Sequence, residues 1–180
     1  QIRTSMQLYA NDPSSFVFFT GNAAKGKSVG LEAEIRWTPI ERLELYLNGG
    51  LLRAKIDQYS GPDTSLNDRD AAHAPRYTYS AGWDYRYPSG IFIMMSASAR
   101  DEFYFDVSHN EKSKAFELLN ARIGYEKENW SIQLWGKNLT NEKFAVRGFY
   151  FGNEPPDFPN AVYTRRGDPR QIGLTFDMRF

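Results

Sequence analysis

The sequence contains no cysteine and only two histidines among its 180 residues. A disulfide framework and a cysteine-ligated metal centre are therefore both excluded. Lysine plus arginine number 22 and aspartate plus glutamate number 22, so the zero net charge favours neither nucleic acid nor an acidic substrate as a partner. The mean hydropathy is −0.59, and no apolar run approaches the roughly 18 residues of a membrane-spanning helix, which excludes a helical membrane protein.

Alternation of apolar and polar residues is the main signal that is present. Near the end of the chain, small or charged residues alternate with a strictly apolar set: Ile172, Leu174, Phe176, Met178 and Phe180. A period of two predicts a β-strand with one wholly apolar face. The same alternation predicts eight strands, at residues 2–10, 28–37, 42–53, 76–87, 91–103, 116–126, 129–139 and 170–180. The low mean hydropathy is compatible with a membrane barrel, because the residues that face its lumen are polar.

The connections between these strands alternate in length. Short turns are expected at Thr38–Glu41, Pro88–Gly90 and Lys127–Glu128, and long segments at 11–27, 54–75, 104–115 and 140–169. This alternation predicts an all-β fold, a transmembrane antiparallel up-and-down β-barrel, with the short turns on the periplasmic side. Eight strands then place both ends of the chain on that side.

Aromatic residues make up 16% of the sequence and fall near both ends of the expected strands. On the apolar parity, six lie near the short turns and three near the long loops: Trp37, Tyr85, Tyr87, Tyr125, Trp130 and Phe180, and then Tyr77, Tyr79 and Phe103. Two bands of rings around an aliphatic zone are typical of two lipid–water interfaces. Period two alone does not distinguish this outward orientation from a soluble, lipocalin-like barrel that turns the same face inward.

Several motifs resemble TonB-dependent outer-membrane receptors. They are Gly21–Lys25 with Ser28–Glu34 and Trp37–Pro39, Ala74–Tyr79 with Tyr85–Pro88, Leu118–Tyr125, Trp130–Asn141, and Gly167–Leu174 with Arg179–Phe180. The resemblance covers nearly the whole chain outside the long loops, and the Asn138-Leu139-Thr140 element and the chain end are its most specific parts.

The resemblance implies that residues 1–180 are the last eight strands of a larger barrel of about 22 strands. Its localisation would be the bacterial outer membrane, and its function the import of a chelated metal, such as a ferric siderophore, or a similar nutrient. Outer-membrane lipid and a small-molecule metal chelate would be partners, and the plug domain and TonB complex would act through an N-terminal part that this chain lacks. The terminal Phe180 resembles the signal read by the outer-membrane assembly machinery. The resemblance implies neither an enzyme nor a cofactor.

The last long loop combines aromatic rings with guanidinium groups. The candidate ligand-binding residues are Arg147, Phe149, Tyr150, Phe151, Arg165 and Arg166. Rings stack on flat chelates, and arginine pairs with anionic oxygens. The alternative is that these side chains pack the loop on itself. Residues 16–19 are expected to extend a strand above the membrane.

Little else in the sequence suggests chemistry. His73 and His109 lie in long loops, and the carboxylates between Asp63 and Asp70 lack the spacing of a calcium-binding loop, so no metal or catalytic residue is assigned. Two other functions stay open at this point: a self-contained eight-stranded barrel with a structural or adhesive role, and a soluble ligand-binding barrel.

Overall fold

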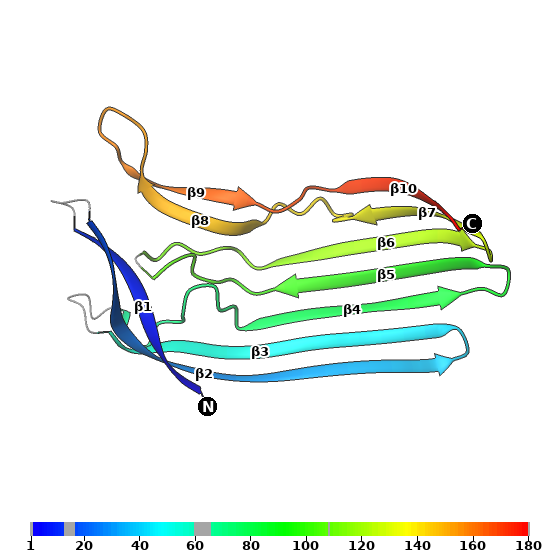
Figure 1. Ribbon diagram of the computed structural model, residues 1–180, viewed down its shortest axis with the longest axis horizontal. Coiled ribbons are helices and arrows are strands. Elements are labelled where there is room, and N and C mark those ends of the chain that lie inside the picture. The colour runs from blue at the N-terminus through cyan, green and yellow to red at the C-terminus, as the bar shows by residue number, and fades with distance from the viewer. Residues whose placement is uncertain (1, 13–16, 60–65, 108, 180) are drawn as a thin grey trace.

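The computed structural model describes residues 2–12, 17–59, 66–107 and 109–179. They form one curved antiparallel sheet in the order β1-β2-β3-β4-β5-β6-β7-β10 and a separate hairpin, β8-β9 (Figure 1). The strands are β1 Ile2–Asp12, β2 Val17–Ile40, β3 Leu43–Tyr59, β4 Tyr77–Arg86, β5 Ile91–Arg100, β6 Phe116–Glu126, β7 Trp130–Lys137, β8 Ala145–Gly152, β9 Asn160–Arg166 and β10 Gln171–Met178. A search of the described residues finds no helix with the length and apolarity needed to span a membrane.

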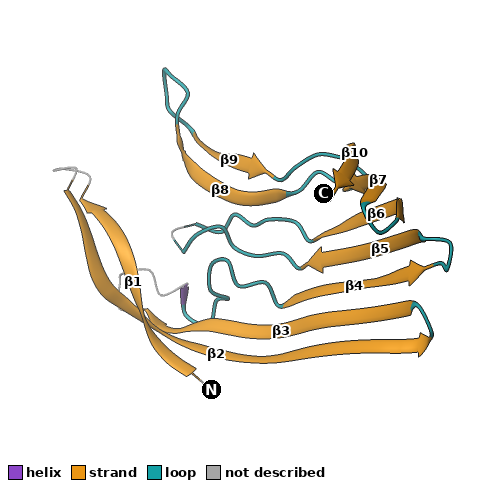
Figure 2. Cartoon of the chain, turned by 45° about the vertical axis from the view of Figure 1, so that its right-hand side comes forward, coloured by secondary structure: helices purple, strands orange, loops and turns teal. Residues whose placement is uncertain are grey.

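The predicted meander is confirmed. Short turns join β2 to β3, β4 to β5 and β6 to β7 at one end of the sheet, and the longer connections lie at the other end (Figure 2). Within the described ranges, β1 and β10 are the two edges of the sheet and do not pair with each other. The chain by itself is therefore an open, curved wall, and the alternative of a closed eight-stranded barrel is wrong.

The predictions for two of the long loops are wrong in part. The segment 11–27 was expected as a loop, but β2 begins at Val17 and pairs with β1 far beyond the predicted strand. Likewise β3 continues to Tyr59, through the first residues of the expected loop 54–75. Both extensions are stabilised by cross-strand backbone hydrogen bonds, which do not require the added residues of β2 and β3 to alternate.

The expected loop 140–169 contains further strands. The hairpin β8-β9 projects beyond the end of the sheet where the long connections lie (Figure 1). Its short strands were not predicted, because polar and aromatic residues follow one another in β8 without a period of two.

The apolar face of the sheet is directed outward. Leu31 and Leu174 are 67% and 68% exposed, and Ile132 is 36% exposed. These side chains do not meet in a dry interior, which excludes the soluble barrel with an inward apolar face. Exposed aliphatic side chains in such a continuous band require an apolar solvent, and the lipid of a membrane supplies it.

Large rings lie directly opposite glycines on the polar face. In each pair, a Cβ added to the glycine would come within 2.7 Å of the facing ring. The three cross-strand pairs are Tyr46 with Gly82, Phe92 with Gly124, and Trp135 with Gly173. Each ring therefore lies flat over the backbone of the next strand, and the indole N–H of Trp135 also donates to Thr175 Oγ1 at 3.0 Å.

One expected member of the aromatic bands is misplaced. Phe103 shares the apolar parity but is only 4% exposed, and its ring lies 5.2 Å from that of His73 and 5.8 Å from that of Phe105. The connection between β5 and β6 folds back over itself there, so Phe103 belongs to a small core above the sheet. In contrast Trp37, Tyr79 and Tyr87 are exposed as expected.

Candidate functional site

The polar face lines a hollow of about 380 Å³ in the middle of the wall. Its lining includes Arg122, Lys137, Asn120, Gln133 and Trp135, which project from β6 and β7. Register places Arg122 opposite both Met94 and Trp135, so the guanidinium lies among apolar neighbours and contacts the Met94 sulfur. This face therefore presents polar and cationic groups to the space that a barrel would enclose.

Near the short turns, the polar face carries a row of charged side chains of both signs. Arg36 lies 3.2 Å from Glu34 and 3.4 Å from Glu44, and Arg86 pairs with Asp84 and Glu126 at 3.4 and 3.1 Å. These pairs are partly exposed, and each contributes roughly 0.2–1 kcal/mol. The lumen surface here therefore carries two arginines among four carboxylates, a net charge of −2, contributed by β2, β3, β4 and β6.

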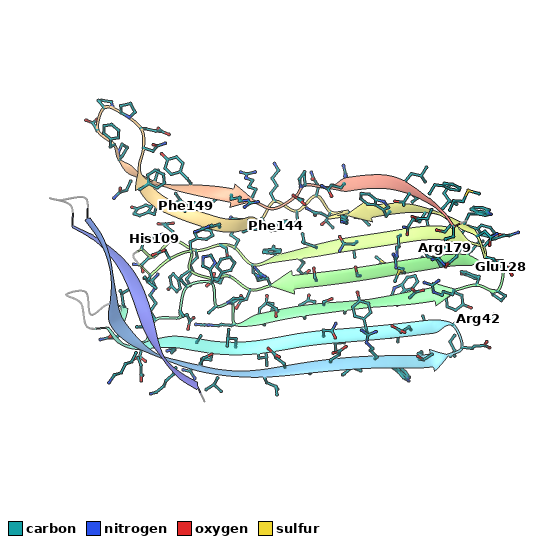
Figure 3. The ribbon with its side chains drawn as sticks, in the orientation of Figure 1. Arg42, His109, Glu128, Phe144, Phe149 and Arg179 are labelled. Atoms are coloured by element: carbon teal, nitrogen blue, oxygen red, sulfur yellow. The ribbon has the colours of Figure 1, made fainter. Side chains whose placement is uncertain are left out.

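The hairpin β8-β9 holds all six predicted ligand-binding residues, but its two faces divide them. Arg147 lies opposite Arg165, and Phe149 and Phe151 follow at alternate positions on the same face. This face is exposed: Phe149 and Phe151 are each 45% exposed, and the Arg147 guanidinium lies 4.9 Å from the centre of the Phe149 ring. We call these four residues the arginine–phenylalanine face. Figure 3 shows Phe149 at the loop end of the molecule, far from the short turns.

The other face of the hairpin packs on the connection between β5 and β6. The Tyr150 ring lies 5.4 Å from the His109 ring, and Gly148 is buried beneath Phe105. Arg166 follows Arg165 and so lies on this second face. Tyr150 and Arg166 are still exposed at the margin, yet the structure does not bring them together with the other four residues.

The base of the hairpin is fixed by the buried side chain of Asn138, which is 4% exposed. Its Nδ2 donates to the carbonyls of Glu142 and Asp168 at 2.9 and 3.0 Å, and its Oδ1 accepts from the Glu142 N–H at 2.8 Å. The Asn138 N–H in turn donates to Asn120 Oδ1 at 3.0 Å. One amide thus joins the end of β7, the entry to β8 and the return to β10.

Stacked rings support the same base. The Phe144 and Phe116 rings are 4.3 Å apart, and a Cβ added to Gly167 would lie 2.0 Å from the Phe144 ring. Figure 3 places Phe144 between the hairpin and β6. The hairpin is therefore anchored to the sheet by both polar and aromatic contacts.

The neighbouring connections are tied together by Arg69 and Lys112. The Arg69 guanidinium donates to the carbonyls of Asp106 at 2.7 Å, Val107 at 3.4 Å and His109, and lies 4.0 Å from the centre of the Tyr104 ring. Lys112 Nζ lies 2.7 Å from Glu102 Oε1, and this hydrogen bond raises the pKa of Lys112. These contacts give the loops beside the hairpin a defined conformation.

Sequence reasoning missed the structural roles of Asn138 and Arg69. The signal for Asn138 was available, because an asparagine directly after a strand readily adopts the positive φ of 48° that it has here. Arg69 gave no such signal, since its partners are backbone carbonyls of a distant segment.

A metal centre finds no support in the described part of the chain, where no group of three or more histidine, aspartate or glutamate side chains is close enough to hold an ion. His73 contacts Phe103, and His109 Nδ1 accepts the Glu111 N–H at 3.2 Å. Asp70 pairs with Arg76 at 2.8 Å, and that hydrogen bond raises the pKa of Arg76. Asp63 and the predicted assembly signal Phe180 lie outside the described residues.

A curved antiparallel wall with an exposed apolar band, a polar concave face and long connections at one end defines the class of outer-membrane β-barrels. Residues 3–139 match the family described as TonB dependent receptor-like, beta-barrel. The chain therefore belongs to this family of outer-membrane receptors, which are not enzymes.

Solved structures of low sequence identity share the fold. The ferric yersiniabactin uptake receptor FyuA from Yersinia pestis matches 90% of this chain with a TM-score of 0.77 at 18% identity, over 25% of its own length. The siderophore receptor PiuA from Acinetobacter baumannii matches 98% with a TM-score of 0.75 at 15% identity, again over 25%. The copper transporter OprC matches 97% with a TM-score of 0.69 at 13% identity, over 27%. The chain spans about a quarter of the length of these proteins.

Proposed function

We propose that residues 1–180 are the C-terminal part of one transmembrane barrel domain, in a receptor that imports a chelated metal of the ferric siderophore type or a similar nutrient. The plug domain and the contacts with the TonB complex would come from parts of the receptor outside this chain. Family membership supports this proposal, as do solved barrels whose names refer to ferric siderophores.

Within that receptor, we assign ligand capture to the hairpin β8-β9. The observation that carries this assignment is the arginine–phenylalanine face, where two opposed guanidinium groups flank exposed rings at the loop end. Arginine pairs with anionic oxygens in a forked geometry, and rings stack on flat ligand surfaces. The face therefore fits an anionic, partly aromatic metal chelate. Tyr150 and Arg166, on the second face, would contact the ligand only at its edge.

Binding measurements on the complete receptor, with a panel of ferric chelates of different charge, test this assignment. In the Arg147→Gln/Arg165→Gln variant, the dissociation constant for an anionic chelate should rise about tenfold or more for each lost charge-assisted hydrogen bond. A neutral chelate should bind nearly as before.

Arg166→Gln is the control on the other face of the same hairpin, where it removes one positive charge and is compared with each single variant, Arg147→Gln and Arg165→Gln, as well as with the double variant. We expect at most a threefold change. If Arg166→Gln weakens binding as much as the double variant, or if neither variant affects any chelate in the panel, the arginine–phenylalanine face is not the site of capture.

A further inference from the structure

A basic patch lies on the convex face of the wall, directly above the exposed aliphatic band. On β2 and β3, the outward positions Leu31 and Val29 are 67% and 52% exposed, and Leu51 is 61% exposed. The next outward position along β3 is Arg53, which lies opposite Val29, and the one after it is Lys55, opposite Lys27. The aliphatic side chains thus give way abruptly to three cations: Lys27, Arg53 and Lys55.

The patch retains positive charge after its internal contacts are counted. Lys27 Nζ lies 2.9 Å from Asp57 Oδ2, which neutralises one cation. Across the described ranges, no side-chain carboxylate lies within ion-pair distance of Arg53 or Lys55, and Arg53 is exposed. Asp70 lies opposite Lys55 but pairs with Arg76 at 2.8 Å, so these two charges cancel. The three cations and Asp57 leave a net charge of +2.

The position of the patch along the membrane normal indicates which part of the lipid it contacts. Figure 3 labels Arg42 and Glu128 at the short-turn end of the molecule. The patch lies toward the opposite end, where the long connections are. Lipid acyl chains cover the aliphatic positions, and the next outward positions, about 7 Å further along each strand, reach the headgroup layer. Cations in that layer attract anionic headgroups, and arginine binds phosphate oxygens through its fork of N–H donors.

We propose that Lys27, Arg53 and Lys55 bind the phosphate groups of a lipid in the outer leaflet. Arg53 and Lys55 hold the phosphate, while Lys27 is shared with Asp57. This inference depends on the membrane orientation of the convex face and is independent of the ligand that the receptor carries.

The proposal is tested by measuring the binding of lipid A, the phosphorylated probe, to the complete receptor in non-ionic detergent. Dephosphorylated lipid A is the comparison. Native mass spectrometry or a fluorescence titration gives the affinity. The Arg53→Gln/Lys55→Gln variant should bind lipid A about 30-fold more weakly, since each cation contributes roughly fivefold at an anionic surface. The dephosphorylated lipid should bind the two proteins equally.

Two further variants separate charge from folding. Arg42→Gln/Lys127→Gln removes the same charge at the short-turn end and should leave lipid A binding unchanged. Arg53→Lys/Lys55→Arg keeps both charges and should bind within threefold of the unmodified protein. The proposal is overturned if the glutamine variant at the patch binds lipid A as well as the unmodified receptor does. It is also overturned if removing the lipid phosphates has no effect, or if millimolar inorganic phosphate occupies the patch and lipid does not. Chelate binding should not change in any of these variants. A negative result for lipid binding would therefore not count against the proposed function in chelate import.

Discussion

The strongest test of the hairpin anchor is Asn138→Ala. This change removes three side-chain hydrogen bonds, to the Glu142 N–H and to the carbonyls of Glu142 and Asp168, at a position that is 4% exposed. A net contribution of about 0.5–1.5 kcal/mol for each bond gives a loss of about 2–4 kcal/mol in the free energy of local opening. Alanine is also less favourable than asparagine at a φ of 48°.

Amide hydrogen exchange of the complete receptor in detergent measures that loss directly. Because 1.4 kcal/mol corresponds to a tenfold change in an equilibrium constant, exchange at the Glu142 and Leu139 amides should accelerate about 30- to 1,000-fold. Exchange in β4 and β5, which do not contact the anchor, should stay unchanged.

Two variants divide the effect between side chain and backbone. Asn138→Gly deletes the same hydrogen bonds but tolerates the positive φ, so it should account for most of the acceleration. Asn141→Ala removes only the exposed bond from Asn141 Oδ1 to the Arg170 N–H, and should accelerate exchange less than tenfold. If Asn138→Ala changes exchange at the hairpin base by less than threefold, the anchor assignment is refuted.

Three further predictions concern the wall and the loops. Gly124→Val should destabilise the folded receptor by about 1–3 kcal/mol in urea unfolding, because the added Cβ would lie 2.4 Å from the facing ring; an unchanged midpoint would contradict that packing. In variants that retain a single tryptophan, brominated lipid should quench Trp37 on the convex face and leave Trp135 unquenched; equal quenching would mean that the two faces are misassigned. The raised pKa of Lys112 means that its bond to Glu102 stabilises the loop below the pKa of an unfolded lysine and is lost as pH rises through the folded pKa. Protease cleavage between β5 and β6 should therefore increase as the pH rises above the ordinary lysine pKa of 10.5, and Glu102→Gln should reduce that pH dependence.

The parts of the fold that the sequence predicted are those fixed by local alternation. In β6, the observed bounds Phe116–Glu126 are the predicted ones, because Leu119 and Ile123 alternate regularly with Asn120 and Arg122. Residues 17–19 of β2 were expected to extend a strand, but residues 20–27 were missed because they do not alternate, while pairing with β1 holds them in the strand.

In the candidate site, too, the sequence predicted some features and not others. Composition alone identified the arginines and rings of the last loop as a group. It did not show that Phe149 and Tyr150 lie on opposite faces of a hairpin, because the alternation has meaning only once the strand exists. Phe103 was assigned to the membrane interface since its parity is apolar, but parity does not reveal whether lipid or another loop covers the ring.

The ring–glycine pairs follow a rule that links sequence to strand register. Each of the three pairs joins two strands that are connected by a long segment, β3 with β4, β5 with β6, and β7 with β10. The strand pairs joined by short turns have their register set by the turn itself. A long connection imposes no such constraint, and a shift of one residue would turn the ring to the lipid face and the apolar residues to the lumen.

A ring opposite a glycine removes that ambiguity, because only the glycine leaves room for the ring to lie over the neighbouring backbone. In any other register the ring would meet a Cβ, as the contacts within 2.7 Å at Gly82, Gly124 and Gly173 indicate. The polar face therefore does more than line the lumen: it specifies how the wall is assembled at the three places where the loops are long enough to allow an error. Long, variable ligand-capturing loops and a single strand register are compatible in this wall because the lumen face, and not the loop, fixes the register.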